Sequence, residues 1–265
     1  MTTLATPVGP SPLRRVGALA AAETRLLARN RTAVVNSVLM PLLLVGFVAV
    51  VGGDGLLGAD LLVAAAGFTL VFLTYYNLVT TYVARREDLV LQRLRTGELS
   101  DGQVLLATAV PTLLVTAVQI GLVAAGVAVL GRWTAPVDPV LPVLAVLLGA
   151  TVMVLLATAS TVFTRTPESA QITTLPVVMG ATALSGLFFP LNVLPEELAT
   201  VARLLPLTPV IELAQLGVDG RTWDGEVVAG AGLWWAALGP LGTLLAWTAI
   251  AALATARWFR WSPRR

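Results

Sequence analysis

The stretch VLLATAVPTLLVTAVQIGLVAAGVAVL, residues 104–130, decides the fold because it contains no Asp, Glu, Lys or Arg. About 20 consecutive apolar residues are enough for a helix to cross a lipid bilayer, and this stretch is longer. A helix of a soluble protein would carry charged residues along the face that meets water. Residues 104–130 are therefore predicted to span a membrane.

Similar apolar runs occur on both sides of this stretch, and the charges lie almost entirely in the gaps. The chain is 57% hydrophobic and only 12% charged, whereas an average soluble domain has about 25% charged residues. We therefore predict an all-α membrane protein with six transmembrane helices, at residues 33–52, 61–84, 104–130, 140–163, 171–190 and 230–256. The predicted parts of the chain are an N-terminal segment, a transmembrane domain and a basic tail, at residues 1–32, 33–256 and 257–265.

All basic residues of the chain are arginines, and their distribution is uneven. Fourteen of the seventeen precede the first predicted span, follow the second or fourth, or follow the sixth. The other three, Arg132, Arg203 and Arg221, lie in the remaining loops. Because arginines concentrate in loops on the cytoplasmic side of a membrane, both termini are predicted to be cytoplasmic. A composition rich in Ala, Leu, Val and Arg suggests a bacterial source, so the expected location is the bacterial plasma membrane.

The chain contains no His, Cys or Lys, which excludes several kinds of chemistry. It lacks the commonest metal ligands, a thiol nucleophile and an imidazole base, so no metal, catalytic residue or cofactor is predicted in it. The motif G-x-x-x-x-G-K-[ST] is absent, so the chain is not expected to bind ATP in that manner. The acids Glu196, Glu197 and Glu212 are interpreted as charges at helix ends, which makes an intramembrane enzyme a minor alternative.

The predicted spans contain polar residues but no securely placed ionisable ones. An ionisable residue at a helix centre would cost about 2.5–3.5 kcal/mol, and such residues usually mark ion paths. The most prominent polar group is Tyr75, Tyr76 and Asn77, and it has two interpretations. These side chains either make hydrogen bonds between helices, worth about 0.6 kcal/mol each, or line a substrate path.

Residues 11–31, SPLRRVGALAAAETRLLARNR, have the pattern of an amphipathic helix. One face is apolar and the opposite face is basic, with Leu13, Val16, Ala20 and Leu27 on the first and Arg14, Arg25 and Arg29 on the second. Glu23 interrupts the apolar face. The pattern favours a helix that lies on the cytoplasmic leaflet, although a basic flank of the first span that happens to be helical would look the same.

Residues 85–103, RREDLVLQRLRTGELSDGQ, form the loop after the second span. A short helix is predicted over residues 86–95, with its acids first and its bases last as the helix dipole favours, and Gly97 is placed to end it. Ser100 and Gln103 have the spacing of a capping box for the third span. Exposed leucines on such a helix indicate a docking surface for a cytoplasmic partner. The candidate residues are Arg86, Glu87, Asp88, Leu91, Arg93 and Leu94.

Residues 185–217, SGLFFPLNVLPEELATVARLLPLTPVIELAQLG, are too short and too often interrupted by proline to form a further span. A helix is predicted after Pro195, with two glutamates in its first turn, and it stops at Pro206. A second short helix is predicted over residues 209–216. This pattern is typical of a re-entrant hairpin in the outer leaflet, and backbone of this kind needs protein or water around it.

Taken in order, these features resemble the permease subunit of type-2 ABC exporters, the group that includes daunorubicin-resistance and polysaccharide-export permeases. The resemblance covers essentially the whole chain. It rests most on LSGLFFPLNVLPEELATVARLLPLTP, residues 184–209, and next on RRE and LQRLRTGELS in the loop after span two. The positions of this signature are Ser185, Gly186, Pro190, Pro195, Pro206 and Pro209. Many relatives carry a basic residue after this segment, where this chain departs from them with ELAQ at residues 212–215.

The resemblance implies an efflux function, such as drug resistance, that depends on a separate ABC ATPase subunit carrying ATP and Mg. It also implies that residues 86–96 are the coupling helix that sits in a cleft of the ATPase, and that residues 11–31 are the connecting helix beside it. Two copies of the chain, or the chain and a close relative, would pair around the translocation path, largely through spans one and five. The other expected partner is the lipid bilayer, and no nucleic acid is expected.

Two questions stay open at the level of the sequence. Spans without charge favour an amphiphilic or hydrophobic cargo over a small ion, but a drug, an antibiotic, a lipid and a glycan carrier all fit. The alternative function is a secondary carrier or channel without an ATPase, which intramembrane charges or inverted repeats would favour, and neither is evident.

Span five carries small residues four positions apart, Ala181 with Ser185 and Thr182 with Gly186. Such pairs let two helix backbones approach closely, so span five is predicted to lie between two copies of the chain. Packing of the same residues within one chain is the alternative.

Overall fold

The computed structural model describes residues 11–51, 58–187 and 191–262. Within these residues every regular element is a helix, apart from one isolated bridge between Arg221 and Val227. The order along the chain is α1 (Pro12–Arg29), α2 (Arg31–Val51), α3 (Ala59–Phe68), the π-helix η2 (Thr69–Tyr76), α4 (Asn77–Glu87), α5 (Val90–Arg95), α6 (Asp101–Val129), α7 (Val140–Ser160), α8 (Ala170–Leu184), the 3-10 helix η3 (Leu191–Val193), α9 (Glu196–Arg203), α10 (Thr208–Asp219) and α11 (Ala231–Trp258). The all-helical prediction is confirmed.

Four helices in the described part of the chain are long and apolar enough to cross a membrane. They are Ala59–Glu87, Asp101–Val129, Val140–Ser160 and Ala231–Trp258, which match the predicted spans at residues 61–84, 104–130, 140–163 and 230–256. The first of them combines α3, η2 and α4. The pair α9 and α10 is bent by 87° and counts as a fifth candidate, either a broken span or a re-entrant segment. The chain is therefore a multi-pass membrane protein with four to five candidate spans.

The two other predicted spans correspond to α2 and α8, which contribute shorter apolar helices. In α2 this is Ser37–Phe47, and α8 has 15 residues. At a rise of 1.5 Å per residue, α8 is about 22 Å long, whereas the hydrocarbon core of a bilayer is about 30 Å thick. Residues 188–190 of the predicted fifth span lie outside the described residues. The count of six spans therefore stays a prediction.

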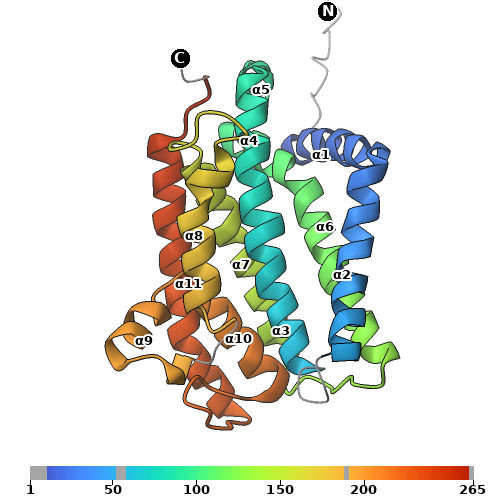
Figure 1. Ribbon diagram of the computed structural model, residues 1–265. Coiled ribbons are helices and arrows are strands. Elements are labelled where there is room, and N and C mark those ends of the chain that lie inside the picture. Colours follow the sequence, from blue (N-terminus) through green and yellow to red (C-terminus); the bar gives the residue numbers. More distant parts are fainter. Residues whose placement is uncertain (1–10, 52–57, 188–190, 263–265) are drawn as a thin grey trace, which may run out of the picture.

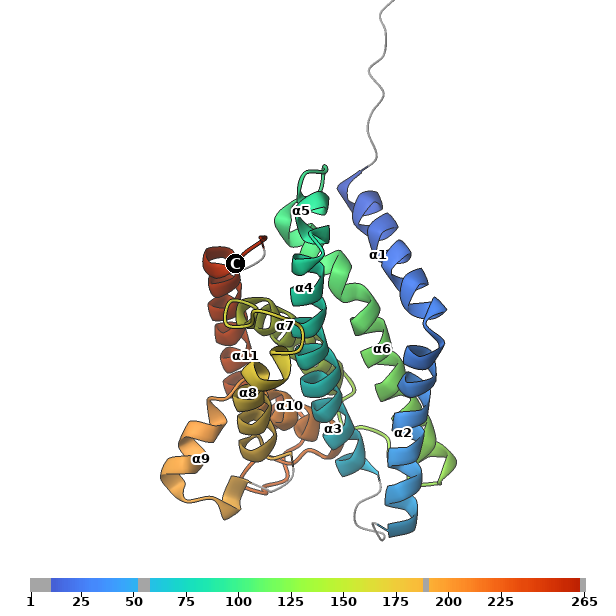
Figure 2. The ribbon, with the colours of Figure 1, turned by 45° about the horizontal axis from the view of Figure 1, so that its top comes forward.

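The long helices form a bundle whose two ends differ (Figure 1). α1 runs across one end, where α5 and the C-terminal end of α11 also lie, and this end is called the α1 end below. α9 and α10 lie at the opposite end (Figures 1 and 2). The beginning of α1 and the end of α11 are thus at the same end of the bundle.

The short helix α10 is part of the core, where it packs against α7, α11 and α3. Its residues Val210, Ile211 and Leu213 are buried in the main hydrophobic cluster. Its neighbours supply glycines at the points of closest approach, since Gly67 of α3 faces Ile211 and Gly149 of α7 faces Val210. The helix is therefore covered by protein, which is the condition under which backbone that does not cross the membrane is tolerated at membrane depth.

The small residues of α8 and its C-terminus pack inside the chain. Ala181, Thr182 and Ser185 are buried, and Gly186, with φ of +80°, lies against the indole ring of Trp223. The prediction that these residues lie between two copies is therefore wrong, because the chain itself already covers that face. The exposed face of α8 carries larger residues, among them Ile172, Leu175 and Met179.

We expect Gly217→Ala to weaken the packing between α10 and α7. A Cβ at position 217 would lie 2.7 Å from Cγ of Pro142 and 2.8 Å from the carbonyl oxygen of Asp138, and overpacking of this kind costs about 1–3 kcal/mol. The measurement is the midpoint of thermal unfolding of the purified protein. Gly121→Ala in α6 is the matched control, because nothing lies within 4 Å of a Cβ there. Equal midpoints for the two variants would contradict this packing.

Candidate functional site

The chain turns sharply between α4 and α5 at the α1 end of the bundle. α4 continues to Glu87, and Leu89 then adopts a left-handed conformation with φ of +60° before α5 begins at Val90. Leu89 is the only non-glycine residue with a positive φ in the described part of the chain. The prediction of one helix over residues 86–95 is therefore wrong, because its first two residues end α4. Leucine rarely adopts this conformation, so the local sequence gives no sign of the break.

The turn exposes a small surface of mixed charge, formed by Glu87, Asp88, Leu89 and Arg93. These four residues are called the corner surface. α5 projects beyond its neighbours at this end in Figure 1. Leu89 leaves 40% of its area exposed. An exposed leucine held in a strained backbone conformation points to a functional constraint at that position.

Arg86, next to the corner surface, is buried, with 1% of its area exposed. Its guanidinium donates hydrogen bonds to the carbonyl oxygens of Thr161 at 3.0 Å, Thr164 at 2.6 Å and Arg165 at 3.3 Å. These carbonyls follow the last turn of α7, where backbone acceptors lack helical partners and the helix dipole favours a cation. The prediction that Arg86 lies on a docking surface is therefore wrong, and the residue instead ties α4 to the end of α7.

The loop that receives Arg86 is also held by bonds of its own. The backbone N–H of Thr166 donates to Oγ of Ser169 at 3.1 Å, and that hydroxyl donates to the carbonyl oxygen of Thr166 at 2.8 Å. A hydrogen bond from its own backbone N–H, and a second from Thr166, lower the pKa of Glu168. The acceptors of Arg86 thus sit in a short, internally bonded loop.

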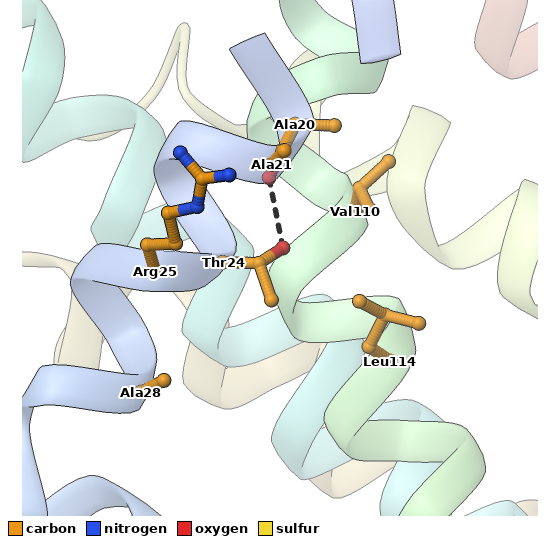
Figure 3. A pocket seen from close by; sticks show the side chains of 7 residues that line it. All are labelled: Ala20, Ala21, Thr24, Arg25, Ala28, Val110 and Leu114. Atoms are coloured by element: carbon orange, nitrogen blue, oxygen red, sulfur yellow. Dashed lines mark hydrogen bonds between the residues drawn. The ribbon is translucent and has the colours of Figure 1, made fainter. Parts of the chain in front are cut away.

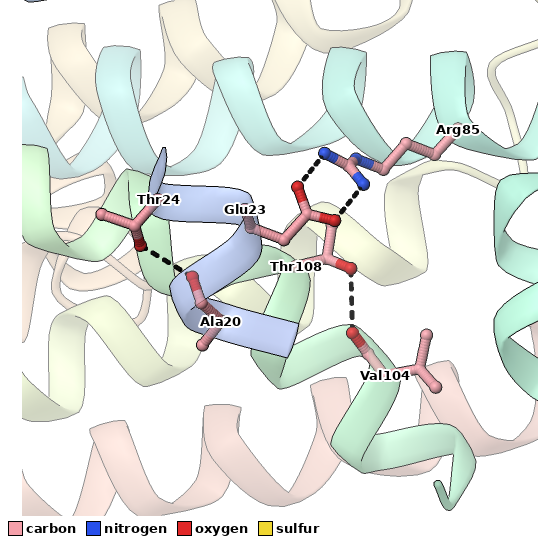
Figure 4. A network of polar contacts seen from close by, with 6 residues as sticks. All are labelled: Ala20, Glu23, Thr24, Arg85, Val104 and Thr108. Carbon is pink, nitrogen blue, oxygen red and sulfur yellow. Dashed lines mark hydrogen bonds and ion pairs between the residues drawn. The ribbon is translucent and has the colours of Figure 1, made fainter. Parts of the chain in front are cut away.

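Arg85 forms a bidentate ion pair with Glu23 of α1, in which each guanidinium Nη atom contacts one carboxylate oxygen (Figure 4). Glu23 is only 6% exposed, and this contact explains why an acid interrupts the apolar face of the predicted amphipathic helix. Bidentate pairs of this type are among the strongest charge-assisted hydrogen bonds. A second ion pair joins Arg15 to Glu98 at 2.8 Å, but Glu98 is exposed, so this pair contributes little.

Tyr82 makes a third connection from α4, because its hydroxyl donates to the carbonyl oxygen of Leu105 in α6 at 2.9 Å. Tyr82, Arg85 and Arg86 therefore bond to α6, α1 and the loop after α7, respectively. Arg85 and Arg86 follow Tyr82 by three and four residues on the last turns of α4, and the three residues are called the α4 anchor. Tyr82 and Glu23 were not among the site residues predicted from the sequence. For Glu23 the sequence did contain a signal, because an acid within the apolar face of a helix needs a partner there.

α5 is held against the bundle from two sides. Leu91 is fully buried and Leu94 is partly buried, so the prediction of exposed leucines is wrong for Leu91. The guanidinium of Arg95 lies 5.1 Å from the centroid of the Trp261 ring, and its Nε donates to Asp101 at 3.1 Å. The C-terminal segment, predicted as a basic tail, therefore also supports α5 through Trp261.

Two predicted features at the α1 end are present. The backbone N–H of Ser100 donates to Oε1 of Gln103 at 2.9 Å, which forms the capping box of α6. A helix is present in the predicted amphipathic segment, as α1. Figure 3 shows the shallow hollow between α1 and α6, which is lined by Ala20, Ala21, Thr24, Arg25, Ala28, Val110 and Leu114.

The three residues considered for a substrate path do not face one common space. Tyr75 is buried, and its hydroxyl pairs with that of Ser160 in α7 at 3.0 Å, so it matches the interpretation of a hydrogen bond between helices. Tyr76 is partly buried and packs against the main core. Asn77 lines a cavity between α1, α2, α4 and α6. Successive residues of a helix point in different directions around its axis, which is why these neighbours separate.

At the opposite end, the predicted hairpin corresponds to α9 and α10. Glu196 and Glu197 occupy the first turn of α9, as predicted. Glu212 lies inside α10 and is partly buried, so its interpretation as a charge at a helix end is wrong. The signature prolines flank the helices, with Pro195 before α9 and with Pro206 and Pro209 buried at the start of α10, whereas Pro190 lies outside the described residues.

Within the residues that the structure describes, no group of three or more His, Cys, Asp or Glu side chains could hold a metal ion. The corner surface and the α4 anchor adjoin each other at the end of α4 and are together called the junction. The profile of one protein family, described as ABC-2 type transporter, matches residues 14–217, which is more than half of the chain. The chain belongs to the ABC-2 type transporter family, and is a membrane component of transport. No curated protein matches the chain.

We expect Arg86→Met to destabilise the protein by about 1.5–3 kcal/mol, the range for a hydrogen bond to a charged group. The substitution keeps an unbranched side chain but removes the donors to the carbonyls of Thr161 and Thr164. The measurement is the midpoint of thermal unfolding. Arg93→Met, at an exposed position on α5, is the control and should melt as the unchanged protein does. A midpoint for Arg86→Met as high as that of the control would show that the hydrogen bonds of Arg86 to the end of α7 do not contribute to stability.

We also expect Glu23 and Arg85 to be energetically coupled. Glu23→Gln and Arg85→Gln should each cost about 1.5–3 kcal/mol. This is less than the 3–5 kcal/mol for breaking a fully buried pair, because the Arg85 side chain is 24% exposed. A double-mutant cycle on unfolding free energies should give a coupling of about 0.5–3 kcal/mol. Additive effects of the two substitutions would show that the pair does not hold α1 to α4.

Proposed function

We propose that the chain is the membrane-spanning permease subunit of an ATP-driven exporter in a bacterial plasma membrane. A separate ABC ATPase subunit would bind ATP and Mg and supply the energy. The permease would move an amphiphilic or hydrophobic cargo out of the cell, such as a drug, an antibiotic, a lipid or a glycan-type molecule. Membership of the ABC-2 type transporter family supports this proposal.

The observation that carries the proposal is the combination of the corner surface with the α4 anchor. The corner surface is exposed at the projecting end of α5 and has no catalytic group. Directly behind it, the anchor bonds α4 to α1, α6 and the loop after α7. A partner that moves the corner surface therefore acts on several helices at once, as a coupling element must.

The coupling role belongs to fewer residues than the sequence alone suggested. Glu87, Asp88 and Arg93 are exposed and available to a partner, together with Leu89. Arg86 and Leu91 are buried, so they would transmit movement without touching the ATPase. Leu94 is partly buried, in an intermediate position.

The proposed orientation of the chain in the membrane follows from the positions of its arginines. Those at the α1 end include Arg85 and Arg93 at the α4–α5 corner, whereas Arg203 and Arg221 lie at the α9 end. Since basic residues concentrate on the cytoplasmic side, the α1 end would be cytoplasmic, with both termini there. The corner surface would then be on the side where ATP is available.

Six spans and a second copy of the chain, or of a close relative, complete the proposal. α2 and α8 would be the first and fifth spans, and both expose large apolar side chains, including Leu39 and Phe47 on α2 and Ile172 and Leu175 on α8. Lipid or a second copy would cover these faces. The contact between copies would use the exposed face of α8, because the small residues on its other side are already covered.

We expect Glu87→Arg and Leu89→Asp to weaken binding of the ATPase subunit at least tenfold without lowering the stability of the permease. Both residues are exposed. The first substitution reverses a charge that a partner would use, and the second removes an apolar contact. The measurement is co-purification of the ATPase with the permease from native membranes, followed by cargo-stimulated ATP hydrolysis.

The matched control is Glu197→Arg, which makes the same charge change at an exposed position on α9, at the opposite end. It should retain the ATPase. If the corner variants retain it equally well, the corner surface is not the coupling site. If no ATPase is recovered with the unchanged chain either, the carrier or channel alternative replaces the exporter.

A further inference from the structure

A cavity of about 600 Å³ lies beneath α1, between α2, α4 and α6. Its walls are rows of residues at helical spacing, so it runs along the bundle. The row on η2 and α4 is Leu73, Asn77, Thr81 and Arg85, and the row on α6 is Thr108, Pro111, Thr112, Val115 and Gln119. Asn77 and Arg85 are eight residues apart, about 12 Å along the helix. The cavity therefore reaches from the α1 end well into the apolar part of the bundle.

Several polar groups on these walls have no partner in the described part of the chain. The side-chain amides of Asn77 and Gln119 make no hydrogen bond there, and neither do the hydroxyls of Thr81 and Thr112. Four such groups facing one cavity at membrane depth are costly, because an uncompensated polar group in an apolar medium loses its bonds to water. The arrangement has the form of a small-molecule site, with a few convergent polar groups in a volume typical of such sites.

The two charged residues that line the cavity are already paired with each other. Glu23 and Arg85 both line it, but they are bonded to each other through both carboxylate oxygens (Figure 4). Among the described residues that line the cavity, no other is charged. The free groups are neutral amides and hydroxyls, which bind hydroxyl or amide groups and give no compensation for a net charge.

The opposite side of the cavity, formed by α1 and α2, is mixed. It contributes the apolar residues Leu26, Leu27 and Met40 and the polar residues Glu23, Asn30 and Ser37. Each of the three polar residues already has a partner, so the groups that this side offers to a bound molecule are mainly apolar. This pattern fits a single-chain amphiphile better than a fully polar or a fully apolar solute.

We propose that this cavity binds a single-chain amphiphile with an uncharged head group bearing hydroxyls or amides. Asn77 and Gln119 bind the head group, and Leu26, Leu27 and Met40 contact the chain. A transported solute and a membrane lipid both offer this chemistry. The site lies within one copy of the chain, away from any contact with a second copy on the exposed face of α8. Only the interpretation of the bound molecule as cargo rests on the proposed exporter function.

The chain has no cysteine of its own, so a single Thr81→Cys substitution can report on the cavity in native membranes. The probe is 1-monolauroylglycerol, and the comparators are laurate, which has the same chain length and a charged head, and dodecane, which has no head. We expect monolauroylglycerol to slow the reaction of Thr81→Cys with N-ethylmaleimide at least tenfold, and each comparator to slow it less than twofold. Thr96→Cys, exposed after α5, should react at the same rate throughout.

Asn77→Leu and Gln119→Leu, each combined with Thr81→Cys, should abolish the protection, whereas Gln171→Leu on the exposed face of α8 should keep it. Labelling of Thr96→Cys in each background verifies insertion, and either cavity variant alone decides the outcome. Equal protection by all three compounds, protection that survives in the cavity variants, or a Thr81→Cys that never reacts would overturn the proposal.

A further arm adds the ATPase subunit and ATP. Labelling restored by ATP hydrolysis would identify the bound amphiphile as transported. Unchanged protection would identify it as a resident lipid. Both results support the site. The labelling itself needs no ATPase, so its failure is distinguishable from a failure of the exporter proposal.

Discussion

The rest of the junction depends on one constraint, which is that the backbone acceptors at the end of α7 need donors. Two of these acceptors belong to buried residues, Thr161 and Thr164, and a buried carbonyl without a donor is costly. Arg86 supplies the donors from α4 and is completely covered in doing so. Once Arg86 is fixed, its helix neighbours Tyr82 and Arg85 are fixed too. They bond to α6 and α1, so one cap sets the relation of four helices.

The parts of the fold that the sequence predicted well are those that depend on local hydropathy. Long runs without charge gave four spans at nearly the observed bounds, because each such helix is determined by its own composition. The capping box and the glutamates at the start of α9 were also local signals. The junction at α4 was not predictable in this way. Arg86 stands in a charged run that is typical of a surface, and its partners are carbonyls about 75 residues away, which carry no side-chain signature.

The small residues show a second limit of the sequence. A pair of small side chains four positions apart permits close packing, but it does not specify whether the approaching residue belongs to the same chain. In this protein the pairs on α8 are covered internally, and Trp223 fills the space beside Gly186. The glycines that do determine the packing, Gly67 and Gly149, lie opposite α10. Their role depends on the position of a short helix that is distant in sequence.

The corner surface and the cavity share α4, and this gives the protein a direct route between its two candidate sites. Arg85 lines the cavity and bonds to α1, and it is next to Arg86, which holds α4 to the loop after α7. Asn77 lies about 12 Å further along the same helix. A displacement of the corner surface that moves α4 must therefore either carry α1 with it or break the Glu23 ion pair. If the ion pair breaks, the wall that contains Asn77 moves relative to α1, whose Leu26 and Leu27 line the same cavity. The geometry thus makes the shape of the cavity dependent on the position of the corner.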